Sequence, residues 1–401
     1  MIEAPEKEDT LKRVLFVDDE QNVLDGLQRM LRPLRRQWDM SFALDGPTAL
    51  QLLSERPFDV IVTDMRMPGM DGAQLLSEIK RLYPRTARII LSGHSDHEMI
   101  MKSVSAAHQF LSKPCEPDVI KEIVGRACAL RELLTNPKLE LLISEMRSLP
   151  SLPSLYVELM EELDTVDPSI KQVANIVSRD PGMTAKILQL VNSAFFGLRR
   201  RITSASDAVS LLGLDMTRTL VLSIQIFSEF DSARSHGFPI EEVWSHSMGV
   251  ASLAQAIAKK QTQNAELAQE AFTAGLLHEI GRLILAAKLG EQYKDVLAAA
   301  EREQISITDA ERKFLGAAHP EVGAYLLGLW GLPDSIVQAV AFHHHPGVNA
   351  SEKFDVVTAV HIADCLKSVG VQPDGTALDL SYLEKLGVTA QIPVWEQMAE
   401  E

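Results

Sequence analysis

The chain has 401 residues, of which 46% are hydrophobic and 23% are charged, and its formal net charge at pH 7 is −16. This balance is typical of a folded globular protein, and the length allows two or three compact domains. The negative charge would repel phosphate backbones, so we expect no nucleic acid as a main partner.

We also expect no membrane association and a cytoplasmic location. Residues 1–13 are polar and acidic and lack the apolar run of a secretory signal peptide. The longest apolar stretch, residues 271–289, is interrupted by charged side chains and falls short of the roughly 18 apolar residues that span a bilayer. The cysteines Cys115, Cys128 and Cys365 share no pairing or metal-ligand spacing, which is typical of free thiols.

The first 130 residues alternate between short runs rich in valine and isoleucine and segments with helical periodicity. The strand-like runs are residues 14–17, 40–43, 60–62, 89–91 and 110–111. Short strands that alternate with helices predict a parallel sheet covered on both faces. We therefore expect an α/β domain with a flavodoxin-like, doubly wound, five-stranded parallel sheet, whose ligands lie at the carboxyl ends of the strands.

After Pro117 the strand signal disappears, and the rest of the chain is predicted to be all-helical. Residues 119–134 carry an apolar stripe that predicts a helix. Asp167-Pro168 and Asp180-Pro181 each predict a helix start, because aspartate caps free amides and proline fits the first turn. Further helices are expected near residues 215–227, 244–260, 270–289, 319–329 and 333–343.

Polar side chains follow four strands of the predicted sheet. Asp18 and Asp19 follow the first strand, and Asp64 follows residues 60–63. Because neighbouring parallel strands end at one edge, the three carboxylates should meet there and repel one another unless a hard cation such as Mg²⁺ lies among them. Such an ion neutralises a phosphoryl group, for which a carboxylate is a nucleophile. Ser92 and Lys113 end the fourth and fifth strands and suit phosphoryl oxygens.

Any one of these residues alone would be an ordinary loop acid or helix cap. Five suitable residues at the strand ends of one fold favour a functional site. The stretches that carry them are VLFVDDE (14–20), VIVTDMRMPGMDG (60–72), IILSGHSD (89–96) and FLSKP (110–114). Together they resemble the receiver domain of two-component response regulators.

This resemblance covers about residues 11–129 and implies a role for each residue. Asp64 would be phosphorylated by a histidine kinase. Mg²⁺ would be held by Asp18, Asp19, Asp64 and the carbonyl oxygen of Arg66. The phosphoryl group would be contacted by Ser92 and Lys113, with Phe110 as the switch aromatic.

The helical half contains several histidines on otherwise apolar stretches, together with acidic residues. One buried histidine is more often a hydrogen-bonded core residue than a ligand, because burial is costly only when the ring lacks a partner. Several histidines with two carboxylates favour convergence on a metal ion. The residues concerned are His246, His278, Glu279, His319, His343, His344, His345, His361 and Asp364.

This pattern resembles the HD superfamily of metal-dependent phosphohydrolases, in which a histidine, a His-Asp pair and a later aspartate bind the metal. His246, His278 and Asp364 match these ligands, but Glu279 replaces the aspartate of the pair. One extra methylene would displace a bridging carboxylate by about a bond length, which metal sites tolerate poorly.

The related HD-GYP phosphodiesterases of cyclic di-GMP add further histidine ligands, which His319, His343 and His344 would match. Their GYP signature is absent, since His343 is followed by HHPGVNAS. A closer resemblance, to the HDOD domain, covers about residues 148–345. It rests on the segments LPSLPSLYVEL, RDPGMTAKILQLVNSAFFG, ITSASDAVSLLGL, AFTAGLLHEIGRLIL and HPEVGAYLLGLWGLP. That family is regarded as a non-catalytic signalling module.

The sequence thus predicts a receiver domain at 11–129, a linker helix at 130–146, an HDOD domain at 147–346 and a C-terminal helical extension at 347–401. We expect a response regulator that is phosphorylated on Asp64 and signals through a non-catalytic HDOD domain, with no catalytic residue assigned. Its partners would be a histidine kinase, a downstream signalling protein and, through residues 119–134, a second copy of the chain.

Two alternatives to this reading differ in their chemistry. The first is a metal-dependent cyclic-dinucleotide phosphodiesterase. A second metal ion, in the HDOD domain, is compatible both with this enzyme and with the non-catalytic response regulator. The other is a DNA-binding regulator, which the acidic charge and the lack of a basic recognition helix oppose.

Overall fold

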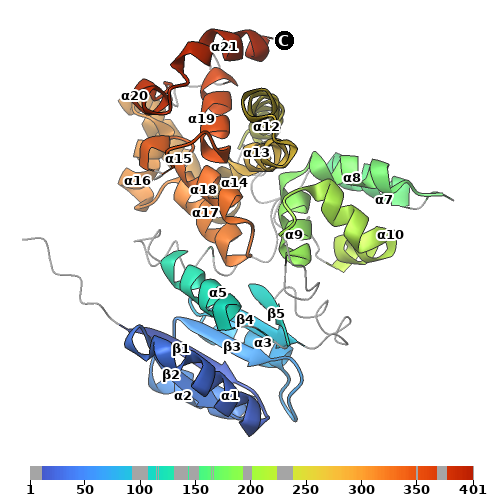
Figure 1. Cartoon of the computed structure of the whole chain (residues 1–401), viewed down its shortest axis with the longest axis vertical. Coiled ribbons are helices and arrows are strands. Elements are labelled where there is room, and N and C mark those ends of the chain that lie inside the picture. Colours follow the sequence, from blue (N-terminus) through green and yellow to red (C-terminus); the bar gives the residue numbers. More distant parts are fainter. Residues whose placement is uncertain are drawn as a thin grey trace, which may run out of the picture. The chain divides into compact units, whose positions relative to one another are not determined.

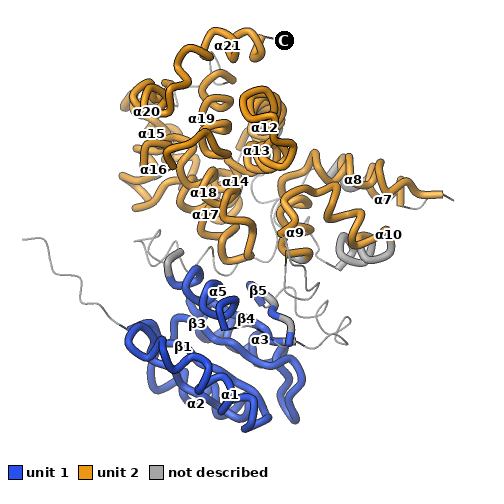
Figure 2. Tube along the Cα trace, in the orientation of Figure 1, with its two compact units in different colours: residues 1–129 blue, residues 130–401 orange. Residues whose placement is uncertain are grey.

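The computed structural model describes residues 11–92, 107–113, 115, 117–130, 143, 153–163, 165, 167–192, 201–223, 238–348, 351–367 and 377–400. The chain divides into two compact units, residues 1–129 and 130–401 (Figure 2). Most of the predicted linker helix, residues 130–146, lies outside the described residues.

The first unit is an α/β domain around one parallel sheet. The strands are β1 (Lys12–Val17), β2 (Trp38–Ala43), β3 (Val60–Asp64), β4 (Ala87–Ser92) and β5 (Gln109–Ser112). Their order across the sheet is β2-β1-β3-β4-β5, and all four neighbouring pairs are parallel. The predicted five-stranded, flavodoxin-like sheet is confirmed, since each strand-like run of the sequence lies inside one of these strands.

The helices of this unit alternate with the strands along the chain (Figure 1). They are α1 (Gln21–Leu31), the short 3₁₀ helix η1 (Arg32–Arg36), α2 (Gly46–Glu55), α3 (Gly72–Leu82) and α5 (Pro117–Leu130). Local sequence explains where they begin: the Asp45 side chain accepts from the Thr48 amide, and Asp71 and Gln74 form a capping box at α3.

Gly72 sets how closely α3 approaches the end of β3. A Cβ atom at this position would lie 2.2 Å from the carbonyl oxygen of Asp64. Only a residue without a side chain lets the helix begin there, so Gly72 helps to place the end of β3.

The second unit is all-helical in its described residues. Its first helices are α7 (Pro153–Leu163), α8 (Ile170–Ser178), α9 (Pro181–Val191) and α10 (Ala205–Ser223). The next are α12 (Ile240–Thr262), α13 (Ala265–Leu277), α14 (Ile280–Leu289), α15 (Glu291–Glu303) and α16 (Ile307–Leu315). The last are α17 (His319–Leu329), α18 (Asp334–Phe342), η4 (Pro346–Val348), α19 (Val356–Lys367), α20 (Leu380–Lys385), η5 (Thr389–Gln391) and α21 (Ile392–Glu400).

Two predicted helix starts have different outcomes. The start at Asp180 is confirmed, since its carboxylate accepts from the Met183 amide at 2.9 Å, next to the first turn of α9. The start at Asp167-Pro168 is wrong by two residues. There Ser169 caps α8, because its hydroxyl accepts from the Gln172 amide.

The predicted helix at 270–289 is also wrong in one respect, because two helices occupy it. The chain leaves α13 at His278 and enters α14 at Ile280, with Glu279 in a non-helical conformation between them. The apolar pattern continues across this break, which is why periodicity did not reveal it. The predicted helix at 215–227 begins ten residues earlier, at Ala205, and Gly213 interrupts it with a φ of 73°.

The core of the second unit is formed by long helices that pack side by side. In Figure 1, α12, α13 and α19 lie together, and α17 and α18 pack beside them. The C-terminal segment packs on this core, since Trp395 is buried and Lys367 Nζ donates to the carbonyl oxygen of Ala399 at 2.7 Å. Among the described residues, no helix combines the length and apolar character needed to cross a membrane.

Candidate functional site

The carboxylate cluster of the first unit forms where β1 and β3 end. Asp18 directly follows β1 and Asp64 ends β3, and both side chains are buried. Lys113, which follows β5, lies between them. Its ammonium group is 2.6 Å from Asp18 Oδ2 and also pairs with Asp64 Oδ1. Asp19 is exposed beside this cluster.

Backbone amides orient both buried carboxylates. Asp64 Oδ2 accepts from the Arg66 amide at 2.6 Å, and Asp18 Oδ1 accepts from the Glu20 amide at 3.0 Å. Asp64 Oδ1 is therefore the oxygen that faces Lys113. These contacts hold both carboxylates in fixed orientations.

Burial has opposite consequences for the two partners of this ion pair. Burial raises the pKa of Asp64, and the hydrogen bond and charge of Lys113 only partly offset it. Burial alone would lower the pKa of Lys113, but hydrogen bonds and charges from Asp18 and Asp64 raise it. Lys113 is thus a cation at neutral pH and neutralises Asp18 and Asp64. A divalent ion bound at this site would neutralise the same two carboxylates.

The remaining predicted residues of this site are placed only in part. Ser92 is the last residue of β4, and Phe110 lies in β5, but their side chains are outside the described residues. Asp64 pairs with Leu91 across β3 and β4, so the backbone of Ser92 lies at the same edge of the sheet as Asp64.

The second unit brings all seven predicted ligand-type residues into one cluster. His246 comes from α12, His278 and Glu279 from the break between α13 and α14, His319 from the start of α17, His343 and His344 from the end of α18, and Asp364 from α19. All are buried except His246, whose side chain is 17% exposed. We call these seven residues the histidine cluster.

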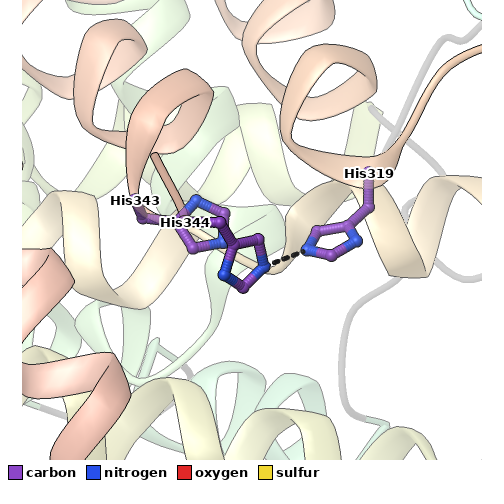
Figure 3. Close-up of side chains that lie close together, drawn as sticks. All are labelled: His319, His343 and His344. Carbon is purple, nitrogen blue, oxygen red and sulfur yellow. Dashed lines mark hydrogen bonds between the residues drawn. The ribbon is translucent and has the colours of Figure 1, made fainter. Parts of the chain in front are cut away.

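The histidine cluster contains two separate groups of three potential ligands and a third group that joins them. In the first, Asp364 Oδ1 lies 3.0 Å from His246 Nε2 and 3.5 Å from His278 Nε2. In the second, His319, His343 and His344 face one another (Figure 3), and the Nε2 atoms of His319 and His344 are 3.1 Å apart. The third group, His278, Glu279 and His343, takes one histidine from each of the other two, and in every group the potential ligand atoms lie within 4.8 Å of one another.

Glu279 lies between the two groups. Its Oε1 is 3.9 Å from His278 Nε2, and its Oε2 is 3.8 Å from His319 Nε2. The Arg282 guanidinium is 3.4 Å from Oε2 on the other side. The longer side chain therefore does reach a position between a histidine of each group, which the sequence alone did not indicate.

Hydrogen bonds at the outer edge of the cluster select the tautomers of two histidines. His278 Nδ1 donates to the carbonyl oxygen of Gly275 at 2.6 Å, and His343 Nδ1 donates to that of Val340 at 2.9 Å. A carbonyl oxygen only accepts, so in a neutral ring the Nε2 lone pair faces the cluster. This arrangement is common among metal-ligating histidines.

Several buried polar atoms of the cluster have no hydrogen-bond partner. They are His278 Nε2, Glu279 Oε2, His343 Nε2 and His344 Nδ1. A buried polar atom without a partner costs about 1–3 kcal/mol, so such a concentration requires an explanation. A cation bound by these nitrogen and oxygen atoms would supply the missing partner, and imidazole with carboxylate suits zinc, iron or manganese.

The protonation states of four residues of the cluster fit a cation, whereas burial opposes protonation of His246 but the hydrogen bond and charge of Asp364 raise its pKa. Burial lowers the pKa of His343 well below its usual value and that of His344 to about 3, which keeps both rings neutral. Burial opposes ionisation of Glu279 and Asp364, but nearby histidines, and Arg282 for Glu279, hold both pKa values below the usual range. Neutral imidazoles and ionised carboxylates are the forms that bind metals.

Sequence reasoning missed two residues behind this cluster. Glu311 on α16 is fully buried, and so is Tyr293 on α15, whose hydroxyl donates to Glu311 at 2.6 Å. The sequence does contain a pattern that indicates burial of Glu311, because this acid lies on the same face of α16 as the apolar residues Ile307 and Leu315. Burial opposes protonation of His319, but the charges of Glu311 and Glu279 raise its pKa to about 9, so the ring is protonated at neutral pH and must release the Nε2 proton to bind an ion.

His361, another histidine of the helical half, has a structural role. Its Nε2 accepts from the Asp379 amide at 3.0 Å, so its Nδ1 carries the proton that is donated to the carbonyl oxygen of His343 at 2.7 Å. Both ring nitrogens are thereby used, and the ring connects the C-terminal segment to the end of α18.

Comparison with known proteins gives two family matches. Residues 14–125 match the response regulator receiver domain, and residues 149–346 match the HDOD domain. A response regulator, MmoQ from Methylococcus capsulatus, has a solved structure with 24% identity and a TM-score of 0.49, covering 62% of this chain and 98% of that one. A virulence factor from Campylobacter jejuni has 21% identity and a TM-score of 0.51, covering 65% and 98%, and supports the fold alone.

Curated relatives match over shorter parts. An uncharacterized protein of Treponema pallidum is 25% identical over 200 residues, which is 49% of this chain and 38% of that protein. The hydrogenase transcriptional regulatory protein HoxA of Cupriavidus necator is 38% identical over 116 residues, which is 28% of this chain and 23% of HoxA. The chain thus spans well under two thirds of the length of these relatives.

Proposed function

Since the chain belongs to the proteins that join a response regulator receiver domain to an HDOD domain, we propose that it is phosphorylated on Asp64 by a histidine kinase and signals through its helical unit. One observation carries this proposal. The Asp64 carboxylate is buried at the end of β3, oriented by the Arg66 amide, and paired through Oδ1 with the Lys113 ammonium.

The proposed reaction transfers a phosphoryl group from a histidine of the kinase. Asp64 Oδ1 attacks the phosphorus, a P–O bond forms, the P–N bond breaks and the released imidazole takes up a proton. Asp18, Asp19, Asp64 and the Arg66 carbonyl would hold Mg²⁺, whose charge offsets the repulsion between carboxylate and phosphoryl oxygens. Lys113 would move from the carboxylates to the phosphoryl oxygens, with Ser92 as a second contact and Phe110 as the switch aromatic.

A phosphate-affinity gel tests this step directly. Incubated with a small phosphodonor such as acetyl phosphate, the wild-type protein should shift only when Mg²⁺ is present. Asp64→Asn keeps the size of the side chain and removes the nucleophile, so its band should not shift. An equal shift in Asp64→Asn would show that another residue accepts the phosphoryl group.

We further propose that the helical unit acts by binding a downstream protein and not by catalysis. The near-complete burial of the histidine cluster supports this, because only the His246 side chain is partly exposed. A pull-down with the wild type and Asp64→Asn, each with and without beryllium fluoride, would test the proposal. A partner that binds only the beryllium fluoride form of the wild type is the expected result.

A second candidate function is metal binding by the histidine cluster. The observation in its favour is that four buried nitrogen and oxygen atoms of the cluster lack a hydrogen-bond partner. One ion would be held by His246, His278 and Asp364, and another by His319, His343 and His344, with Glu279 between them. When bound, such ions supply Lewis acidity and lower the pKa of a bound water, as metal-dependent phosphohydrolases require.

Elemental analysis of the purified protein tests this second candidate. We expect zinc, iron or manganese in a ratio of one or two ions per chain, and the loss of one ion in His278→Ala, which removes a ligand of the group with His246 and Asp364. The receiver site would not contribute, because Mg²⁺ binds weakly enough to be removed on a desalting column. A metal content near zero after growth in metal-supplemented medium would overturn the metal centre and leave the phosphorylation proposal intact.

A further inference from the structure

A buried carboxylate lies directly behind the histidine cluster. Glu311 has no exposed surface and accepts three hydrogen bonds. Tyr293 donates its hydroxyl to Oε1 at 2.6 Å, while Oε2 accepts from the amide of His319 at 2.7 Å and from its Nδ1 at 2.8 Å. A buried carboxylate is costly unless it is paired and hydrogen-bonded, so this set of contacts accounts for its presence.

These contacts determine which nitrogen of His319 faces the cluster. An ionised carboxylate only accepts hydrogen bonds, so the proton must be on Nδ1. Nε2 then lies toward the cluster, 3.1 Å from His344 Nε2 and 3.8 Å from Glu279 Oε2 (Figure 3). Two nitrogens that each bind one ion at about 2.1 Å lie about 3.0–3.4 Å apart at octahedral or tetrahedral angles. The two Nε2 atoms are hydrogen-bonded in the structure, and the same separation would let them share an ion once the proton between them is released.

His319 differs from two other histidines of the cluster in the acceptor behind its ring. His278 and His343 donate Nδ1 to backbone carbonyl oxygens, whereas His319 donates to a carboxylate. A charged acceptor makes a stronger hydrogen bond and draws the Nδ1 proton away from the ring. That increases the electron density on Nε2 and makes it a better metal ligand.

From this geometry we infer that Glu311 is a positioning residue of the metal centre, holding His319 in the tautomer and orientation that present Nε2 to an ion. Tyr293 acts one step further away, because its hydroxyl fixes the orientation of the Glu311 carboxylate. Neither residue touches the ion. This inference rests on the metal-binding function proposed above and extends it to two residues outside the histidine cluster.

The test compares the metal affinity of the full-length protein with that of two variants, using Zn²⁺ in competition with a chromophoric chelator. In Glu311→Gln the amide can donate to His319 Nδ1, which moves the ring proton to Nε2 and blocks the ligand. We expect its affinity for Zn²⁺ to fall by about 10–100-fold. Tyr293→Phe removes one hydrogen bond to the carboxylate, and we expect a fall of about 2–10-fold.

A matched control is available in the same unit. The hydroxyl of Tyr382, also buried, lies 2.7 Å from the Thr358 hydroxyl and is not part of the cluster. Tyr382→Phe should therefore bind Zn²⁺ within about twofold of the wild type. A second readout is the visible absorption of bound Co²⁺, which reports ligand geometry, and it should shift in Glu311→Gln and not in Tyr382→Phe.

The possible results distinguish the role of Glu311 from metal binding by the histidine cluster. A wild type that binds no Zn²⁺ would overturn the metal centre itself. A wild type that binds Zn²⁺, with Glu311→Gln and Tyr293→Phe equal to it in affinity and spectrum, would overturn only the role of Glu311. If Glu311→Gln does not fold by circular dichroism, Tyr293→Phe decides alone, and an affinity equal to that of Tyr382→Phe would refute the inference.

Discussion

Gly281 and His319 approach so closely that a Cβ atom on Gly281 would lie 2.0 Å from the carbonyl oxygen of His319. Gly281 is in the first turn of α14, and His319 is the first residue of α17. The first unit repeats this relationship, because a Cβ atom on Gly72 would lie 2.2 Å from the carbonyl oxygen of Asp64. In both units a glycine lets a helix begin against the backbone of a proposed site residue.

Gly281→Ala should therefore destabilise the helical unit. The added methyl group meets backbone and not a flexible side chain, so α14 and α17 must separate. We expect a loss of about 1–3 kcal/mol, measured by urea denaturation. The control is Gly249→Ala on α12, where the nearest atom would be Lys367 Cδ at 3.8 Å. That variant should match or exceed wild-type stability, and an equal loss in both would contradict the backbone contact.

Lys113→Ala should bind Mg²⁺ more tightly than the wild type. Without the ammonium group, Asp18 and Asp64 lose a cation that competes for the same oxygens. We expect the dissociation constant for Mg²⁺ to fall by roughly 3–10-fold, the equivalent of about 1 kcal/mol. Titration calorimetry of the unphosphorylated protein would measure it. Lys121→Ala removes the same charge from an exposed position on α5 and should leave the constant unchanged, whereas an equal fall in both variants would indicate an effect of net charge alone.

The stability of the first unit should depend on pH through Asp64. Burial raises its folded pKa above the ordinary value of 3.8, with Lys113 opposing. Folding therefore favours the protonated form of Asp64. The free energy of unfolding falls as the pH rises from 3.8 through the raised pKa, because the carboxylate must then ionise in a buried place. Well below pH 3.8 the group is protonated in both states and this loss is absent. Asp64→Asn should raise the melting temperature at pH 7 without Mg²⁺, and the gain should disappear in acid. Asp25→Asn, exposed on α1, is the control and should show no such trend.

The site of the first unit was predictable from the residues because it depends on one topological rule. Asp18, Asp64 and Lys113 each follow or end a strand, and the carboxyl ends of adjacent parallel strands share an edge. The apolar stripe of residues 119–134 was less informative. Ile120 and Val124 on α5 are fully buried, so this stripe packs within the described chain, and a homodimer through it stays a prediction.

The histidine cluster was predictable only through family resemblance. Its seven residues come from five separate places along a helical chain, and helical periodicity does not specify which helices are neighbours. Glu311 was missed for the same reason, since its partners Tyr293 and His319 lie on other helices. The break at His278 and Glu279 also left no trace in the apolar pattern, because both helices that flank it are buried.

Metal binding should stabilise the helical unit. At a free Zn²⁺ concentration of 100 times the dissociation constant, we expect about 2.7 kcal/mol for one site, and a chelator should reverse the gain. Thermal denaturation with and without Zn²⁺ would measure it. His278→Ala should lose the part of the Zn²⁺-dependent gain that comes from the ion held with His246 and Asp364. His361→Gln should keep it, because both ring nitrogens of His361 are already used in hydrogen bonds outside the cluster, even if its melting temperature is lower throughout.

The helical unit should not hydrolyse cyclic di-GMP even when it holds metal. Hydrolysis requires a metal-bound water in line with the phosphorus, and a pocket that admits two guanine bases to the ions. In the histidine cluster, His278, His319 and His343 have no exposed surface. Within the cluster only the His246 side chain is partly exposed, at 17%, which leaves little room for a substrate of that size. The sequence also lacks the GYP segment, since HHPGVNAS follows His343.

Incubation with cyclic di-GMP and excess Mn²⁺ or Fe²⁺, followed by chromatography, would test this expectation. The experiment needs the wild type, shown by elemental analysis to be loaded, and His278→Ala, which lacks a ligand of the group with His246 and Asp364. We expect unchanged substrate with both proteins. The wild type holds metal but is closed to the substrate, and His278→Ala lacks a metal ligand, so neither can place a water at the phosphodiester. Linear dinucleotide that forms with the wild type and not with His278→Ala would establish the phosphodiesterase alternative. It would also mean that Glu279, lying between His278 and His319, serves as well as the aspartate it replaces.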